Sequence, residues 1–278
     1  MIPAAFEYVR AGSLDEALRL LAKYAEDAKV LAGGHSLLPA MKLRLAQPRV
    51  LIDIGRLSEL NFVREDGGKI VLGALTTHRE IEASPLLREK CPLLPEVAGH
   101  IGDVQVRNRG TIGGSLVHAD PAADWPAPAL ALEAEMDIAG PKGKRTLPAA
   151  AFFVDMLQTA LQPGEILTAI RVPTTPKSVA YEKFAQKASG FAICGVAVVV
   201  EGGSARIGVT GVAGKAYRAS AAESALRGKF SASAIPAAAA KAGQGVEALS
   251  DIHASAEYRA HLAGVLARRA LERALARA

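Results

Sequence analysis

The sequence is poor in residues that bind metal clusters. Its 278 residues include only two cysteines, Cys91 and Cys194, which lie far apart within apolar sequence. Two thiols cannot provide the four ligands of an iron–sulfur cluster or a structural zinc site, and the histidines show no metal-ligand spacing. We therefore expect any metal redox chemistry to occur on a different chain, and we interpret the cysteines as buried thiols of a reducing compartment.

Long apolar runs and targeting signals are also absent. No stretch approaches the ~18 uninterrupted apolar residues of a membrane span, and the opening residues MIPAAFEYVR lack the basic and apolar regions of a secretory signal. These features predict a cytoplasmic protein. The formal charge is +5, with arginines concentrated near the C-terminus, where they form either a solvated helix face or a docking surface for an acidic partner subunit. No basic run is interleaved with aromatic residues, so nucleic acid is not an expected partner.

Several common catalytic motifs are missing. The sequence has no G-x-G-x-x-G, no G-x-x-x-x-G-K-[ST] and no H-E-x-x-H. The serines that follow glycines lack the closing glycine of G-x-S-x-G. A common nicotinamide dehydrogenase or a hydrolase is therefore not supported.

Hydrophobic residues make up 50% of the chain, which is enough for a large core and suggests two domains or a pair of close-packed subdomains. Near the N-terminus, a capping box at Ser13 and Glu16 predicts a helix over 14–26. The apolar segments AKVLAGG and RVLIDIG follow as strands, with LLPAMKLRL as a short helix between them. With no strand expected before the first helix, this order indicates a small α/β unit with parallel pairing.

The pattern changes to hairpins after about residue 57. Asp66 to Gly68 supplies the turn of the first hairpin, and Asp120 with Pro121 predicts the start of a helix. Three prolines in RVPTTPKS indicate a domain boundary near 173. Beyond it, FAICGVAVVV and ARIGVTGVAG predict strands, and alanine-rich helices follow. The predicted fold class is α+β, with an α/β N-terminal part.

Two similar loops carry the main functional signal. Ala32-Gly33-Gly34-His35-Ser36 and Thr111-Ile112-Gly113-Gly114-Ser115 are each predicted to join a strand to a helix. Glycine allows a close approach of the backbone, and N–H groups at a helix start favour an anion such as phosphate. Either loop alone could be an ordinary turn. Together they predict a site for a diphosphate.

Most other residues near these loops have more than one interpretation. Asp124, expected early in the following helix, could accept hydrogen bonds from ribose hydroxyls or interact with the helix dipole. His35 could donate to phosphate or act as a catalytic base, and because no other His, Asp or Cys lies beside it in the sequence, we favour a binding or packing role. Arg107 and Arg109 could steer an anion or be solvated, and Trp125 is interpreted as a core residue.

The segments AGGHSLLPAMKLRLAQP, VRNRGTIGGSLVHADPAADWPA and YEKFAQKASGFAICGVAV resemble the FAD-binding medium subunit of the molybdenum hydroxylases, the xanthine dehydrogenase family. Within that family, the resemblance is strongest to the medium subunit of aerobic carbon monoxide dehydrogenase, and it spans nearly the whole chain. It implies an FAD-binding domain of the vanillyl-alcohol-oxidase (PCMH) type over 1–172, with subdomains of about 1–57 and 58–172 and FAD between them. A C-terminal domain over 173–278 would contain a three-stranded antiparallel sheet and helices.

The resemblance also implies a set of FAD-binding residues. The two glycine loops would bind the pyrophosphate, Asp124 the adenosine side, and Ile101, Gly102, Leu161 and Lys187 the flavin region. The full set is Lys29, Val30, Leu31, Ala32, Gly33, Gly34, His35, Ser36, Leu37, Ile101, Gly102, Gly110, Thr111, Gly113, Gly114, Ser115, Val117, Asp124, Leu161 and Lys187. No catalytic acid–base residue or metal ligand is implied. Relatives often have Asn at the position of Ser115, and xanthine-oxidising relatives have an aromatic residue at that of Ile101.

The function implied by the resemblance is electron transfer. A large molybdopterin subunit would oxidise the substrate, and a small subunit with [2Fe–2S] clusters would pass electrons to FAD on this chain. A quinone, NAD or oxygen would then accept them. The implied assembly is a heterotrimer that dimerises, in the cytoplasm or at the inner face of the membrane. Carbon monoxide, an aldehyde and an N-heterocycle remain open as substrates. The residues also leave open a stand-alone flavin oxidase or reductase and a non-enzymatic nucleotide-binding module.

Overall fold

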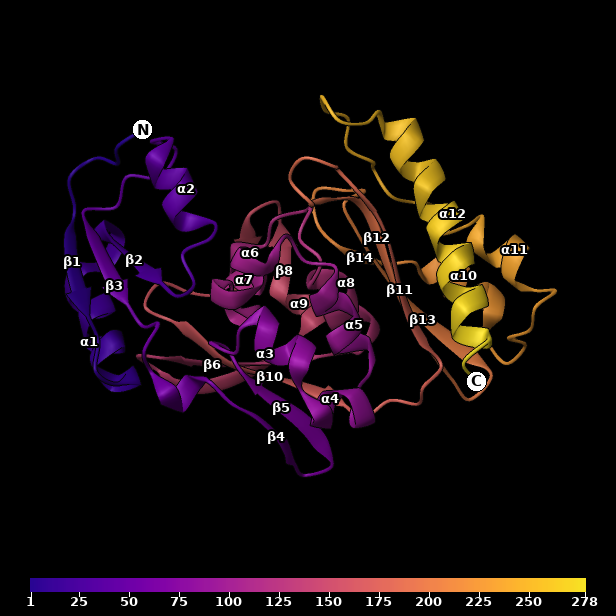
Figure 1. Cartoon of the computed structure of the whole chain (residues 1–278), viewed down its shortest axis with the longest axis horizontal. Helices are drawn as coiled ribbons and strands as arrows, with labels where there is room; N and C mark the ends of the chain where they lie inside the picture. Colours follow the sequence, from indigo (N-terminus) through magenta and orange to yellow (C-terminus); the bar gives the residue numbers. More distant parts are fainter.

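A computed structural model describes all 278 residues. It begins with a small parallel sheet in the order β1–β3–β2 at one end of the molecule (Figure 1). Its strands are β1 (Glu7–Arg10), β2 (Ala28–Leu31) and β3 (Val50–Asp53), and the helices α1 (Leu14–Tyr24) and α2 (Leu37–Lys42) connect them. The Ser13 hydroxyl caps α1 by accepting from the Glu16 N–H at 3.1 Å. The predicted helix and the parallel pairing of β2 with β3 are confirmed.

Strand β1 was not expected, because we predicted no strand before the first helix. It pairs with β3 in parallel, with Glu7 opposite Val50. Three of its four residues are exposed, so it carries no alternation of apolar and polar residues from which it could be predicted. It covers the edge of a strand that is itself fully apolar on its first three positions.

A five-stranded antiparallel sheet forms the centre of the molecule, in the order β4–β5–β10–β6–β7. The hairpin predicted at Asp66 to Gly68 is confirmed, with Gly67 and Gly68 at positive φ in its turn, and a second hairpin joins β6 to β7. The strands are β4 (Val63–Asp66), β5 (Lys69–Gly73), β6 (Glu135–Gly140), β7 (Gly143–Pro148) and β10 (Ile166–Pro173), and a small hairpin adds β8 (Phe153–Asp155) and β9 (Gln158–Thr159). The helices of this part are α3 (His78–Ala83), α4 (Pro85–Lys90), α5 (Leu93–Gly99), α6 (Val104–Arg109), α7 (Ile112–His118), α8 (Pro126–Ala131) and α9 (Ala149–Phe152).

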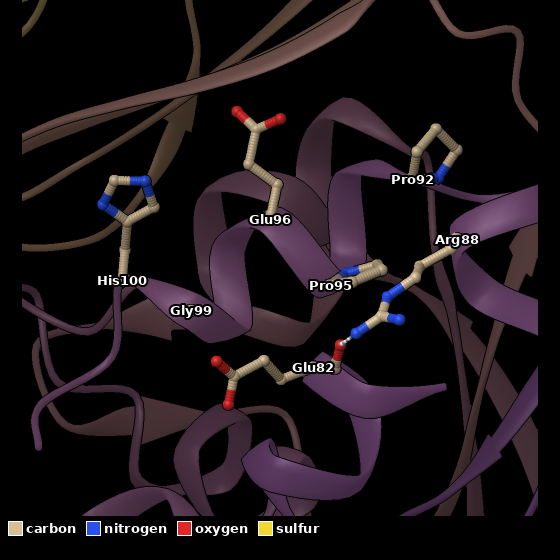
Figure 2. A pocket seen from close by; sticks show the side chains of 7 residues that line it. All are labelled: Glu82, Arg88, Pro92, Pro95, Glu96, Gly99 and His100. Atoms are coloured by element: carbon tan, nitrogen blue, oxygen red, sulfur yellow. Dashed lines mark hydrogen bonds between the residues drawn. The ribbon is translucent and has the colours of Figure 1, made fainter. Parts of the chain in front are cut away.

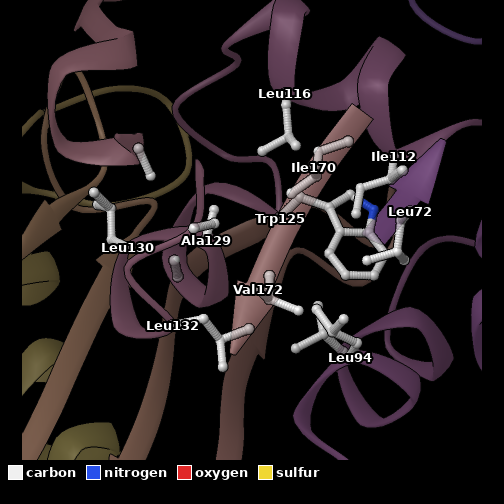
Figure 3. Close-up of a cluster of buried hydrophobic side chains, with 14 of the residues drawn as sticks. Leu72, Leu94, Ile112, Leu116, Trp125, Ala129, Leu130, Leu132, Ile170 and Val172 are labelled. Atoms are coloured by element: carbon white, nitrogen blue, oxygen red, sulfur yellow. The ribbon is translucent and has the colours of Figure 1, made fainter. Parts of the chain in front are cut away.

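Trp125 lies inside the largest core, between the central sheet and these helices (Figure 3). Its side chain is 1% exposed, and its indole N–H donates to Nδ1 of His78 at 3.0 Å. Leu72, Ile112 and Leu94 lie around the ring. The interpretation of Trp125 as a core residue is confirmed, and the polar edge of the indole has the partner that its burial requires.

The C-terminal sheet has four strands in the order β11–β12–β13–β14, so the expected three-stranded sheet was wrong. The additional strand, β14 (Tyr217–Arg218), has two residues and pairs with Val209 and Gly208, which is too short for a periodic pattern. The other strands are β11 (Val179–Ala185), β12 (Ala192–Glu201) and β13 (Ser204–Thr210), and the helices are α10 (Ser220–Leu226), α11 (Ile235–Ala239) and α12 (Ala256–Leu275). No helix of the chain combines the length and apolar composition needed to cross a bilayer.

The C-terminal sheet is buried on both faces. Ala197 and Val199 of β12 belong to the core that surrounds Trp125, whereas Val196 and Val198 belong to the core beneath α12. In Figure 1 the sheet stands between α12 on one side and α8 on the other. Alternate residues of β12 therefore belong to two different cores. The C-terminal sheet separates the core around Trp125 from the core beneath α12 and is packed on both sides.

The helix predicted to begin at Asp120 and Pro121 begins instead at Pro126. The carbonyls of residues 121–123 are occupied by the C-terminal sheet: Pro121 accepts from the Gly211 N–H at 2.7 Å, and Ala122 accepts from the Ala192 N–H at 3.1 Å. Asp120 accepts from the Ala122 N–H at 2.8 Å in a turn. A local capping signal was thus overridden by pairing with residues about 70–90 positions later in the chain.

Gly208 provides a test of how closely α8 packs on the C-terminal sheet. A Cβ added at Gly208 would lie 2.0 Å from the carbonyl oxygen of Ala127, a backbone atom. We expect Gly208→Ala to lower the free energy of unfolding by about 1–3 kcal/mol, because the helix must shift. Urea denaturation measures this effect. Gly243→Ala is the matched control, since its Cβ would meet nothing closer than 3.4 Å, and equal stability of the two variants would contradict the packing described.

Candidate cofactor site

The two glycine motifs lie in direct contact. A Cβ added at Gly33 would lie 2.2 Å from the carbonyl oxygen of Arg109 and 2.9 Å from Cα of Gly110. A Cβ at Gly114 would come within 3.9 Å of the Ala32 side chain. Only glycine at position 33 permits this approach of main chain to main chain. The predicted convergence of the two motifs is therefore present in the fold.

The first motif is the predicted strand–loop–helix turn. It connects β2 to α2, and Gly34 has a φ of +78°. The backbone N–H groups of Gly33, Gly34, His35, Ser36 and Leu37 donate to no acceptor in the protein, and neither does the Ser36 hydroxyl. Ring nitrogen Nδ1 of His35 lies 3.1 Å from the carbonyl oxygen of Gly33. Consecutive unpaired N–H groups of this kind form a cradle suited to an anion.

The second motif was expected to have the same design, and that expectation was wrong. It follows a helix, α6, rather than a strand, and its glycines lie in the first turn of α7. The Ile112 and Gly113 N–H groups donate to carbonyls of the β5–α3 connection, and the Gly114 N–H donates to the Thr111 hydroxyl at 3.1 Å. Within 111–115, the Thr111 N–H and the Ser115 hydroxyl are left without a protein partner.

Close packing explains the glycine at position 113. A Cβ there would lie 2.5 Å from the side chain of Ala74, so a larger residue would push α7 away from the central sheet. The second motif thus sets the position of α7 and of Ser115 relative to the first motif, while the first motif supplies most of the free N–H groups. The remaining predicted residues of this region are half-buried (Val30, Leu31, Val117), exposed (Lys29) or buried (Gly110).

Ile101 and Gly102 form a turn that contacts the C-terminal domain. Gly102 has a φ of +44°. Gly190 lies in the β11–β12 connection, and a Cβ added there would lie 3.4 Å from Cα of Gly102. The same connection carries the exposed Lys187 and Phe191, the latter 48% exposed. Leu161 is half-buried and packs against the central core. The structure therefore places Lys187 and the 101–102 turn in neighbouring segments, although more than 80 residues separate them in the chain.

Asp124 is buried, with 6% exposure, and precedes α8 instead of lying within a helix. One carboxylate oxygen accepts from the Tyr181 hydroxyl, and the other accepts from Lys183 Nζ at 2.8 Å. Burial raises the pKa of Asp124, and the Lys183 ammonium opposes that shift. The helix-dipole interpretation does not apply to a residue held in this way, whereas the contact with adenosine stays a prediction.

His78 is a buried residue of this region that the sequence did not single out. The main-chain N–H of His78 donates to the Gly110 carbonyl at 3.0 Å. A Cβ added at Gly110 would lie 2.7 Å from Nε2 of the His78 ring. Burial, with smaller contributions from the charges of His35 and Arg107, lowers the pKa of His78 to about 4. The neutral ring accepts from Trp125 and supports the start of the second motif. A signal was available, because the Thr77–Glu80 capping box places His78 at the first position of α3.

A surface pocket of about 510 Å³ lies elsewhere, beside α5 (Figure 2). Figure 2 shows Glu96 and His100 extending from α5, and Arg88 donating to the carbonyl oxygen of Glu82. The pocket is lined by Glu82, Arg88, Pro92, Pro95, Glu96, Gly99 and His100. None of these belongs to the predicted cofactor set, and no large apolar side chain lines the pocket to receive an aromatic ring system. The junction of the glycine motifs remains the candidate site.

The family models divide the chain in two. The family described as "FAD binding domain in molybdopterin dehydrogenase" matches residues 4–175, and the "CO dehydrogenase flavoprotein C-terminal domain" matches residues 179–274. The chain belongs to the FAD-binding medium subunits of the molybdenum hydroxylases. This medium subunit is therefore a chain of an oxidoreductase, and it binds FAD. The free N–H groups of residues 33–37 fit that cofactor, because its pyrophosphate is the anion that such a cradle accepts.

Relatives align over the full length of the medium subunit. It is 45% identical to the carbon monoxide dehydrogenase medium chain of Hydrogenophaga pseudoflava, covering 100% of this chain and 99% of the relative. A structure of carbon monoxide dehydrogenase from that organism, lacking the Mo-pyranopterin moiety, matches with a TM-score of 0.95 and 46% identity over 100% and 99% of the two chains. Quinoline 2-oxidoreductase of Pseudomonas putida 86 matches with a TM-score of 0.93 and 35% identity over 99% of each chain.

Gly33→Ala tests the contact between the motifs. Because the added methyl group would overlap the Arg109 carbonyl, we expect the loop to move and FAD to bind at least about tenfold more weakly, a loss of about 1.4 kcal/mol. FAD content and the dissociation constant of the reconstituted chain are the measurements. Gly264→Ala in α12 is the control, since its Cβ would meet nothing closer than 3.4 Å. Wild-type affinity in Gly33→Ala would show that the contact does not shape the site.

His78 makes stability depend on pH with a definite sign. Its pKa of about 4 in the folded chain lies below the ordinary value of 6.5, so the unfolded chain binds the proton more readily in that window. The free energy of unfolding therefore decreases as pH falls from 6.5 towards 4, and the contribution of His78 to this decrease is up to about 3 kcal/mol. We expect His78→Gln to remove this part of the dependence. Denaturant curves of both proteins at pH 7, 5.5 and 4 test it, and parallel profiles would contradict the assignment.

Proposed function

We propose that this medium subunit transfers electrons through FAD in a heterotrimeric molybdenum hydroxylase. In this proposal a small subunit delivers electrons from [2Fe–2S] clusters, a large molybdopterin subunit oxidises the substrate, and a quinone, NAD or oxygen accepts the electrons. When bound, FAD supplies the redox chemistry, while the protein binds and orients it. The observation that carries the proposal is the row of unpaired N–H groups from Gly33 to Leu37, placed where the second motif meets the first.

The binding residues of the proposal follow the two motifs and the turn beside them. Residues 32–36, with Lys29 to Leu31 before them and Leu37 after them, hold the pyrophosphate together with Gly110, Thr111, Gly113, Gly114, Ser115 and Val117. Ile101, Gly102, Leu161 and Lys187 contact the flavin region, and Asp124 contacts the adenosine side. Gly33 to Leu37 contribute N–H donors, and Ser36 and Ser115 contribute hydroxyls that have no other partner in the chain.

The chain's own residues favour this role over independent catalysis. Burial raises the pKa of both Cys91 and Cys194 to about 12, so neither thiol is a nucleophile at neutral pH. No group of three or more His, Cys, Asp or Glu side chains is arranged to hold a metal ion. The buried ionisable groups Asp124, Lys183 and His78 all have partners within the protein. We therefore assign to the buried ionisable groups a role in shaping the cofactor site, not in catalysis.

We further propose carbon monoxide as the substrate of the complete enzyme, which we place in the cytoplasm. The identity of 45% with a carbon monoxide dehydrogenase medium chain supports this choice. The proposal also divides the chain into an FAD-binding domain over 1–172, with subdomains of about 1–57 and 58–172, and a C-terminal domain over 173–278. The end of β10 at Pro173 supports that boundary.

Reconstitution tests the electron-transfer role and the substrate separately. The purified chain with FAD should show flavin absorbance that carbon monoxide, an aldehyde and quinoline all fail to bleach. The complex purified from the native host should reduce its flavin with carbon monoxide, because oxidation occurs on another subunit. A chain that takes up no flavin would refute the role as an FAD subunit. Bleaching of the isolated chain by a substrate would indicate an independent oxidase, and a complex that responds to quinoline but not to carbon monoxide would correct the substrate alone.

A further inference from the structure

A buried lysine of the C-terminal domain reaches the turn proposed to contact the flavin. Lys183 lies on β11, and its side chain is 3% exposed. Its ammonium donates to the main-chain carbonyl of His100 at 3.0 Å and to Asp124 at 2.8 Å. His100 immediately precedes Ile101 and Gly102. The ammonium therefore joins three parts of the chain that are distant in sequence: the end of α5, the segment before α8, and β11.

A second cation holds the same turn from within the FAD-binding domain. Nη1 of Arg107 donates to the Ile101 carbonyl at 3.0 Å, and its Nε donates to Glu82 at 3.1 Å. The carbonyls of two consecutive residues, His100 and Ile101, are thus each held by a different cation. Because a carbonyl shares its peptide plane with the next N–H, these bonds fix the orientation of both peptide groups that lead into Gly102.

The ion pair is built as a rigid unit. Tyr181, two residues before Lys183 on β11, donates its hydroxyl to the other carboxylate oxygen of Asp124. Tyr181 also packs edge-on against the His100 ring, with ring centroids 5.6 Å apart. A buried ion pair of this kind contributes little net stability, because desolvation offsets the attraction, so its value lies in the geometry that it imposes.

We infer that Lys183 is a positioning residue for the flavin, acting through the His100 peptide group. The inference rests on the proposed function, because it takes the Ile101–Gly102 turn as a flavin contact. With Lys183 in place, the turn is held between Arg107 and the C-terminal domain. Without it, the His100 carbonyl loses its charged donor and the turn can rotate away from the cofactor. The C-terminal domain thereby sets the flavin environment through a bond to the main chain.

The test uses the full chain loaded with FAD, as wild type, Lys183→Met and Lys183→Arg. The measurements are the FAD dissociation constant, the reduction potential of the bound flavin and its visible circular dichroism. We expect Lys183→Met to weaken FAD binding about tenfold, the effect of losing one charge-assisted hydrogen bond, and to shift both the potential and the dichroism. Lys183→Arg should recover part of each change, since it keeps a donor for the carbonyl.

A double variant separates positioning from folding. Lys183→Met alone leaves Asp124 buried without its cation, whereas Asp124→Asn/Lys183→Met removes both charges and keeps an amide oxygen for Tyr181. Lys69→Met is the control, because Lys69 also pairs with a carboxylate, Glu135, at 2.7 Å, and neither residue belongs to the proposed cofactor set. Asp124→Asn alone is the reference for the double variant, because it measures the effect of the proposed adenosine contact. Flavin potential and dichroism that differ between the double variant and Asp124→Asn alone, with wild-type values in Lys69→Met, support the inference. Equal flavin properties in the double variant and Asp124→Asn overturn it, whatever the loss of stability. Failure of the wild-type chain to bind FAD would instead refute the proposed function.

Discussion

The contact of Gly33 with the main chain of Arg109 and Gly110 joins the two parts of the molecule that form the candidate cofactor site. The parallel sheet at the N-terminus has its own small core, which meets the central sheet through Leu75 and Ile166. Apolar packing of this kind sets an approximate distance between two units but does not specify their register. The approach of Gly33 to a backbone carbonyl restricts it, because a shift that brought Ala32 into the place of Gly33 would put a Cβ about where only 2.2 Å separates it from the Arg109 oxygen. The unpaired N–H groups of residues 33–37 acquire a defined position relative to Ser115 from this contact.

The C-terminal domain is joined to the site in a different way, through the four residues before Trp125. Carbonyls of this segment accept from the ends of β12 and β13, and the Thr210 hydroxyl donates to Pro121 and Ala123 at 2.8 and 2.7 Å. Asp124 closes the segment with its bonds to β11. Because β12 is also buried on both faces, the two domains pack against each other over the face of a sheet and are not joined by a linker alone. The β11–β12 connection, with Gly190 against Gly102, is thereby held beside the 101–102 turn.

Local signals in the sequence predicted most elements correctly, and the failures share one cause. The helix start at Ser13 and the turn at Asp66 to Gly68 depend on residues within four positions of each other, and the structure confirms them. The helix start at Asp120, strand β1 and strand β14 depend instead on partners far along the chain. The similarity of the two glycine motifs was misleading for the same reason. Gly113 is required by its close packing against Ala74, a contact that no spacing rule in the sequence predicts. The sequence did not predict roles for His78 and Lys183, because their partners, Trp125 and Asp124, are distant from them in the chain.

Recognition through the main chain also bears on how one fold serves different enzymes. The donors of the first motif are backbone N–H groups, which do not change when a side chain is substituted. A substitution in the first motif that leaves the main chain in place therefore keeps these donors. Chains of carbon monoxide dehydrogenase and quinoline 2-oxidoreductase match this one with TM-scores of 0.95 and 0.93, although their names specify unrelated substrates. The fold is therefore shared by relatives whose names specify unrelated substrates, which agrees with a common task of FAD binding in this family.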